Sequence, residues 1–298
     1  MKERGLEIKT LFDCLEYIQE ANLERIQSLD QAVAWLLSIA FKYISHIEKT
    51  DEKIAKEMIL HKIVHTGETM EAMYDILSRE DALDEYFEAA MLAIISHDVG
   101  RFPQVAKHKI ISDDKSRFDH AQASHAILTG EWSELIAPVP FANHPAFDDI
   151  ATAILEHSKF KPAVESLLVA LVRDADKLAI LRGIVEFSDR FKMLRPQLTE
   201  ASESISRTVI ESFLDPQCAT VVNGDVVTIA DDLIAKLAFI FDINLQATKD
   251  ILVEEGILDQ IIAKIIEAAD LDELIANRIR QRVADWKKAE LPTKDWES

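Results

Sequence analysis

Apolar residues recur at helical spacing along most of this chain. A period of 3.6 residues is typical of a helix that buries one face, and it predicts helices wherever it is sustained. Only 7 glycines and 8 prolines interrupt the 298 residues, which favours long helices over many short strands. The pattern therefore predicts an all-α protein. We expect its central helices over Val33–Ile47, Ile54–Leu77, Ala82–Ser96, Ser124–Leu128, Ile150–Leu155 and Val164–Ile184.

Three segments break the helical pattern. Residues 100–119 combine Pro103, a Ser-Asp-Asp cluster and several cations, and we interpret them as a long loop over a pocket. Residues 138–145 begin and end with proline, which predicts a second irregular connection. Residues 220–228 carry β-branched residues on both sides of Asn223-Gly224, and this arrangement predicts a small β-hairpin.

The histidines indicate how the chain is organised. Eight of the nine lie between residues 61 and 157, so we expect residues 50–195 to form the chemical unit. Residues 1–49 are then an N-terminal helical extension. Residues 196–298 are a C-terminal helical extension that includes the predicted hairpin.

The composition of the chain indicates which partners and which cellular location we expect. The formal charge of −20 repels a phosphate polymer, so we expect no extended nucleic acid as a partner. No apolar run reaches the length of a membrane span, and the N-terminus has no apolar core of signal length. Cys14 and Cys218 form no disulfide framework, which fits a reducing cytoplasm. The sequence is compatible with a homodimer and does not establish one.

The dipeptide His97-Asp98 is the first candidate for chemistry, because it directly follows the apolar run AAMLAIIS (89–96). Imidazole and carboxylate are costly to desolvate at the end of a buried helix unless each has a partner. A divalent metal ion satisfies both groups, since Asp oxygen and neutral His nitrogen are ordinary ligands. The dipeptide therefore predicts part of a metal site.

Other histidines and acids lie at suitable places for the same site. His65 shares a helical face with His61, one turn earlier, which we expect to be a neighbour of the site rather than a ligand. His157 ends the apolar run ATAILEHS. At two further places the spacing does not decide which of two residues is the ligand. These are His120 or His125, five residues on, and Asp176 or Asp174.

The order of these residues resembles the HD superfamily of metal-dependent phosphohydrolases. His-Asp-Val-Gly-Arg (97–101) is similar to the His-Asp segment of the family. Asp-Ala-Asp-Lys-Leu (174–178) is similar to its last element, in which the aspartate after alanine is the ligand. The resemblance covers about residues 60–180 and implies an HD-type helical core. It implies that one ion is held by His65, His97, Asp98 and Asp176.

Two more histidines resemble the two-metal branch that includes the HD-GYP phosphodiesterases. His120 to Leu128 fits the pattern of the third histidine of that branch, with Ser124 in place of glycine, and His157 matches its fourth histidine. This likeness implies that Asp98, His120 and His157 hold a second ion, with Asp98 bridging. The Gly-Tyr-Pro segment is absent after His157, so cyclic-dinucleotide specificity is not carried over.

The resemblance implies that a metal-activated hydroxide hydrolyses a small phosphate ester or anhydride, with a nucleotide as the first candidate. The expected cofactors are two divalent metal ions, and these donors do not distinguish Mn, Fe, Ni, Co, Zn or Mg. Asp98 is the expected catalytic ligand, and Arg101 and Lys177 are expected to contact phosphate. Further candidates for substrate binding are the loop cations Lys107, Lys115 and Arg117.

Two other functions stay open. Some HD-fold relatives hold a di-iron centre with the same six ligands and oxidise C–H bonds, and imidazole and carboxylate also suit iron. Alternatively, the chain is a non-catalytic nucleotide sensor or assembly module in which the C-terminal helices do the work. Metal analysis and turnover of generic phosphoesters distinguish these functions.

Overall fold

The computed structural model describes residues 26–48, 53–80, 83–111, 118–132, 134, 137–186, 198, 205–217, 220, 221, 223–269, 271–291 and 296. Over these ranges the chain is built from helices and contains no β-sheet, which confirms the predicted all-α class. Internal contacts divide it into two compact units, a first unit of residues 1–176 with 296–298 and a second unit of residues 177–295. The predicted boundaries after residues 49 and 195 stay predictions, since both lie outside the described residues.

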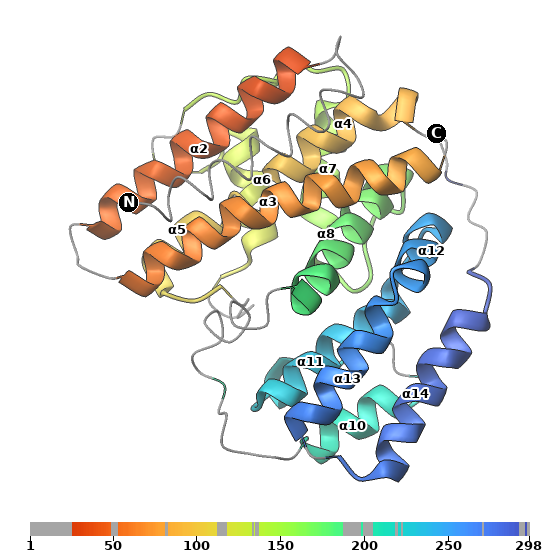
Figure 1. Cartoon of the computed structure of the whole chain (residues 1–298). Coiled ribbons are helices and arrows are strands. Elements are labelled where there is room, and N and C mark those ends of the chain that lie inside the picture. Colours follow the sequence, from red (N-terminus) through yellow and green to blue (C-terminus); the bar gives the residue numbers. More distant parts are fainter. Residues whose placement is uncertain are drawn as a thin grey trace. The chain divides into compact units, whose positions relative to one another are not determined.

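The first unit is a set of packed helices. Figure 1 shows α2 beside α3, and α3 in turn packs on α4, while α6 packs on α7. The last helix of the unit, α8, continues into the second unit. The helices are α2 (Ile26–Glu48), α3 (Lys53–Arg79), α4 (Leu83–Ser96), α5 (Arg101–His108), α6 (His120–Thr129), α7 (Phe147–Glu156) and α8 (Leu167–Glu186).

Helix α4 forms the centre of the first unit. Every residue from Ala90 to Ile95 has an exposed fraction of 0%, and α2, α3 and α7 all contact the helix. A helical segment that is apolar on all sides, as residues 89–95 are, is stable only when other helices cover it. Because α4 ends at Ser96, the next two residues, His97 and Asp98, emerge inside the protein.

The predicted loop over residues 100–119 is wrong in its first half, where the chain forms α5. Phe102, Val105 and Ala106 are buried, and their spacing places them on one helical face. Pro103 does not prevent this helix, because it lies in the first turn, where a backbone N–H has no helical partner. The helix ends at His108, and its C-cap, Lys109, adopts the left-handed conformation with φ of 60°.

Gly100 allows α6 to lie against the turn between α4 and α5. Its backbone N–H donates to the Ser124 hydroxyl at 2.9 Å. A Cβ atom at this position would lie 2.4 Å from the carbonyl oxygen of His120 and 2.6 Å from the backbone nitrogen of Ser124. The absence of a side chain at residue 100 therefore brings the first turn of α6, with His120, close to Asp98.

We predict that Gly100→Ala lowers the free energy of unfolding by about 1–3 kcal/mol, because the added methyl group overlaps the backbone of α6. Gly183→Ala is the control, since nothing lies within 4 Å of a Cβ added at this position within α8. It should raise the free energy of unfolding by roughly 0.5–1 kcal/mol. Urea unfolding followed by circular dichroism measures both. A Gly100→Ala variant as stable as the wild type would contradict the close contact.

The second unit is also helical. Within it, α11 packs on α10 and α13, and α13 packs on α12 and α14. The elements that follow α8 are α10 (Arg207–Leu214), η1 (Asn223–Asp225), α11 (Ile229–Leu237), η2 (Ala238–Asp242), α12 (Gln246–Glu254), α13 (Ile257–Ala269) and α14 (Glu273–Lys288).

The hairpin predicted for residues 220–228 is wrong for the part of it that the structure describes. Asn223–Asp225 form one turn of 3₁₀ helix, and Thr228 is the N-cap of α11. The backbone N–H groups of Val227 and Thr228 each donate to a carboxylate oxygen of Asp231, at 3.1 Å. A capping box thus takes the hydrogen bonds that a second strand would need.

Among the helices that the structure describes, none combines the length and apolar character needed to cross a membrane.

Candidate metal centre

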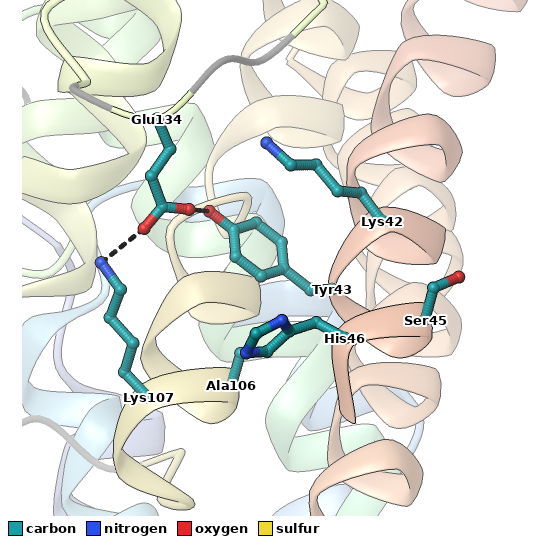
Figure 2. Close-up of a pocket in the computed structure, with 7 residues that line it drawn as sticks. All are labelled: Lys42, Tyr43, Ser45, His46, Ala106, Lys107 and Glu134. Atoms are coloured by element: carbon teal, nitrogen blue, oxygen red, sulfur yellow. Dashed lines mark hydrogen bonds and ion pairs between the residues drawn. The ribbon is translucent and has the colours of Figure 1, made fainter. Parts of the chain in front are cut away.

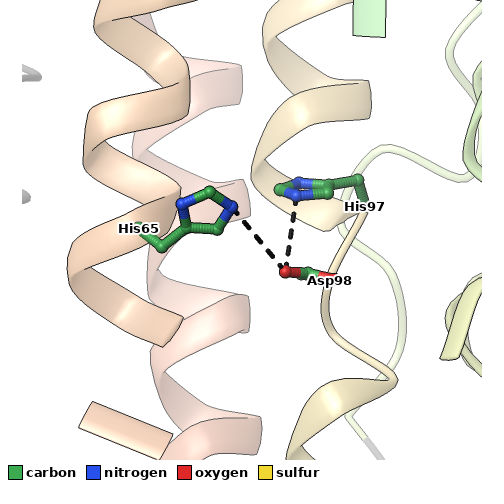
Figure 3. A group of neighbouring side chains, drawn as sticks. All are labelled: His65, His97 and Asp98. Carbon is green, nitrogen blue, oxygen red and sulfur yellow. Dashed lines mark ion pairs between the residues drawn. The ribbon is translucent and has the colours of Figure 1, made fainter. Parts of the chain in front are cut away.

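His65, His97 and Asp98 converge where α3 lies against the end of α4. Figure 3 shows both imidazoles directed at the Asp98 carboxylate. The Nε2 atoms of His97 and His65 lie 3.5 Å and 4.0 Å from Asp98 Oδ2. The three side chains are buried and offer ligand atoms within 4.8 Å of one another, so they form a first group suited to a metal ion.

Two further groups share residues with the first. Asp98 also belongs to a group with His120 and His157, while His97 and His157 form a group with Asp176. His120 Nε2 lies 3.3 Å from Asp98 Oδ1 and 3.0 Å from His157 Nε2. On the other side, His65 Nε2 lies 2.9 Å from Asp176 Oδ1. The three groups are therefore one continuous cluster, which we call the six-residue cluster: His65, His97, Asp98, His120, His157 and Asp176.

Two histidines of the cluster are oriented by the helices that they end. His97 Nδ1 lies 2.6 Å from the carbonyl oxygen of Ile94, and His157 Nδ1 lies 2.6 Å from that of Ile154. Carbonyl groups in the last turn of a helix lack helical partners, and they accept from an imidazole three residues on. Donation through Nδ1 leaves Nε2 as the lone-pair atom, which is the form that binds a metal.

The two carboxylates are held in their charged form. Burial opposes ionisation of Asp98, but the positive charges of Lys62 and Arg101 keep its pKa well below its usual range. Burial also opposes ionisation of Asp176, and the hydrogen bond with His65 keeps the pKa of that carboxyl well below its usual range. Both side chains are therefore available as anionic ligands.

The imidazoles of His157 and His65 respond differently to their surroundings. Burial, together with the neighbouring His120, lowers the pKa of His157 to about 3, so this ring is neutral at ordinary pH. Burial acts in the same direction on His65, but its hydrogen bonds with Asp176 and Glu68 raise its pKa overall. Without an ion, His65 therefore serves as a hydrogen-bond donor to Asp176.

Two cations lie against Asp98. Lys62, which is one turn before His65 on α3, places its Nζ atom 2.6 Å from Asp98 Oδ2. Arg101 places its Nε atom 3.3 Å from Asp98 Oδ1, and its second contact is with Gln104. Arg101 was a candidate from its place in the sequence, whereas Lys62 was not. Its spacing from His65 was the available signal, because residues three apart share a helical face.

Arg173 is a second residue that the sequence analysis missed. Its exposed fraction is 2%, and its guanidinium donates to the carbonyl groups of Glu156, His157 and Lys159 where α7 ends. A cation at the C-terminal end of a helix is favourable, because the last carbonyl groups point outward there. Arg173 lies one turn before Asp176, so α8 supplies a candidate ligand and also fixes the segment that carries His157.

The structure places one member of each pair that the spacing left open in the cluster, and the other member outside it. Asp176 belongs to the cluster, whereas Asp174 is buried but is in none of the three groups. His120 belongs to it as well, whereas His125 does not. His61 is also outside the three groups and stacks on the ring of His65, with ring centres 6.2 Å apart.

The remaining candidate cations have other positions. Lys107 forms an ion pair with Glu134 at 2.7 Å and lines a pocket of about 390 Å³ next to Tyr43 (Figure 2). Glu134 also accepts a hydrogen bond from Tyr43, and burial together with this bond raises the pKa of the tyrosine. Lys177 belongs to the second unit, where its Nζ atom lies 3.1 Å from Asp242. The other two loop cations, Lys115 and Arg117, lie outside the described residues.

The donor atoms of the cluster are suited to a metal ion. Its ligand atoms are imidazole nitrogens and carboxylate oxygens, the set that Zn, Mn, Fe and related ions accept. The buried Nε2 atom of His97 makes no hydrogen bond within the described residues, although it lies 3.5 Å from Asp98 Oδ2 and 3.8 Å from Asp176 Oδ1. An orphaned lone pair that faces two carboxylates is costly unless a cation joins them.

Comparisons with models of protein families, with curated proteins and with solved structures each find no match for this chain. The helical architecture and the buried His/Asp cluster are compatible with an HD-type site.

We predict that His120→Ala lowers the number of metal ions bound per chain or weakens their binding by roughly 10–100-fold, because the cluster loses one nitrogen ligand. His125→Ala is the matched control on the same helix and should keep the wild-type value. Elemental analysis of protein purified without chelators, followed by titration with Zn²⁺, measures both. Equal losses in the two variants would show that α6 contributes no specific ligand.

Proposed function

We propose that this protein is a metal-dependent phosphohydrolase that acts on a phosphate ester or anhydride bond in a small molecule, with a nucleotide as the first candidate. One observation carries the proposal. Six side chains in the order of the HD ligands converge in one buried cluster, in which Asp98 belongs to two of the three groups. The proposal includes an HD-type core and two divalent metal ions as cofactors.

The charge of the cluster supports an anionic substrate. Asp98 and Asp176 carry two negative charges, and Lys62 and Arg101, which lie against Asp98, carry two positive charges. With neutral imidazoles, the charges of these four side chains cancel, and Glu68, which lies 3.8 Å from His65, adds one negative charge. Two divalent ions would therefore leave an excess of positive charge. In a chain of net charge −20, such a local excess favours binding of a small anion at the cluster.

The chemistry would then be divided between the ions and the side chains. Divalent ions held by these ligands would act as Lewis acids toward phosphoryl oxygens and would lower the pKa of a bound water, so no serine or cysteine nucleophile would be required. Arg101 is positioned by Asp98 and Gln104, and its planar guanidinium is suited to a phosphate oxygen pair. Burial of the ligands keeps bulk water from competing with these contacts.

We predict that Asp98→Ala and His97→Ala reduce phosphate release by about 10³-fold or more, because each removes a ligand shared between two groups. The assay screens nucleotides and p-nitrophenyl phosphoesters with Mn²⁺, Fe²⁺, Co²⁺, Ni²⁺, Zn²⁺ and Mg²⁺. His125→Ala serves as the active control, and circular dichroism checks the fold of each variant.

Full activity in a folded His97→Ala or Asp98→Ala variant would reject the proposal. Iron in the purified protein, with the EPR signal of a coupled iron pair and without phosphate release, would favour the di-iron oxygenase instead. Tight nucleotide binding without turnover under any metal would favour the sensor.

A further inference from the structure

Lys62 contacts the Asp98 carboxylate, which belongs to the first ligand group. Its Nζ atom lies 2.6 Å from Oδ2, and the side chains of Lys62 and Asp98 are 11% and 5% exposed. A charge-assisted hydrogen bond of this length in a buried site is strong. It uses the one carboxylate that belongs to two of the three ligand groups.

The contact and the proposed ion would share a single oxygen atom. Oδ2 is the atom that His97 Nε2 and His65 Nε2 approach, at 3.5 Å and 4.0 Å. An ion bound by these three residues would therefore lie beside the ammonium group. Two cations at such short range repel each other strongly in a buried environment, so the ion and the ammonium group compete for Asp98.

The side chain of Lys62 is suited to such an exchange. Its ammonium group is a compact charge on a flexible four-carbon stem, which can change its position without movement of α3. Arg101, by contrast, lies on the other carboxylate oxygen, Oδ1, and is also held by Gln104. Of the two cations, Lys62 is the one in direct competition with an ion of the first group.

We propose that Lys62 is an exchangeable counter-ion of Asp98. It balances the buried carboxylate when no ion is bound and leaves Oδ2 when a divalent ion binds. This inference rests on the metal centre of the proposed function. The metal affinity then depends on how strongly the ion and the Lys62 ammonium group each bind Asp98. Without an ion, Lys62 keeps the charge of Asp98 balanced.

The test measures metal affinity and thermal stability of the full chain, with Zn²⁺ and Mn²⁺ as probes. Lys62→Met and Lys62→Gln remove the charge, and the second variant keeps a hydrogen-bond donor in case the first does not fold. Lys56→Met, which changes a half-buried lysine on the same helix, is the matched control. Competition with a colorimetric chelator gives the dissociation constants, and thermal unfolding with and without EDTA gives the Tm values.

We expect both Lys62 variants to bind the ions at least about tenfold more tightly than the wild type, because the competing charge is gone. Without metal, their Tm should fall below that of the wild type, since Asp98 loses its counter-ion, and added metal should raise it by a larger amount than in the wild type. Lys56→Met should match the wild type in affinity and in the metal-induced shift.

Unchanged or weaker metal affinity in both Lys62 variants would overturn the inference, because Lys62 would then only hold Asp98 in place. These readouts do not depend on turnover, so the two proposals can fail separately. Tighter binding in the variants with no phosphate release from any substrate would support the exchange and count against the hydrolase. If neither the wild type nor the variants bind an ion, the metal centre and this inference are both overturned.

Discussion

The buried charge of Asp98 is the constraint around which the first unit is arranged. A carboxylate that is 4% exposed is several kcal/mol less favourable than one in water unless other groups compensate it. The compensation comes from different helices, since Lys62 lies on α3, Arg101 on α5 and His120 on α6. Gly100 is part of the same arrangement, because only a residue without Cβ lets α6 approach this closely. Packing of these helices is thus coupled to the electrostatics of one side chain.

The helix ends are what make the cluster possible. His97 follows α4 and His157 follows α7, and each donates through Nδ1 to a carbonyl oxygen of the last helical turn. This local bond satisfies an orphan carbonyl and also fixes which nitrogen faces the cluster. Arg173 then binds the carbonyl groups at the end of α7. Ligand orientation therefore depends on backbone groups that every helix leaves without partners, and it needs no bound ion.

The sequence indicated which side chains cluster better than it indicated what surrounds them. Asp98 followed from its place at the end of an apolar run, whereas His120 and Asp176 followed from the family resemblance, because spacing alone left His125 and Asp174 open. Lys62 followed from neither, because a lysine on a helix is usually solvated, and only its depth in the fold gives it a partner. The helix α5 was missed because Pro103 was interpreted as a breaker, although a first-turn proline is tolerated. At residues 220–228, the turn dipeptide Asn223-Gly224 favours a hairpin, but the capping box with Asp231 starts a helix there instead. Asp231 lies three residues beyond the segment that carries the hairpin signal.

These contacts also bear on how metal binding and folding are related. In a small zinc domain the ligands have no other partners, so the ion supplies the folding free energy and the apo chain is unfolded. Here Asp98 is paired with Lys62, Asp176 with His65 and the rings of His97 and His157 with carbonyl groups. The apolar core around α4 is closed independently of these pairs. An ion would therefore enter a preformed cluster and exchange existing hydrogen bonds for ligand bonds. In this respect the cluster differs from such a zinc domain, whose ligands have no other partners.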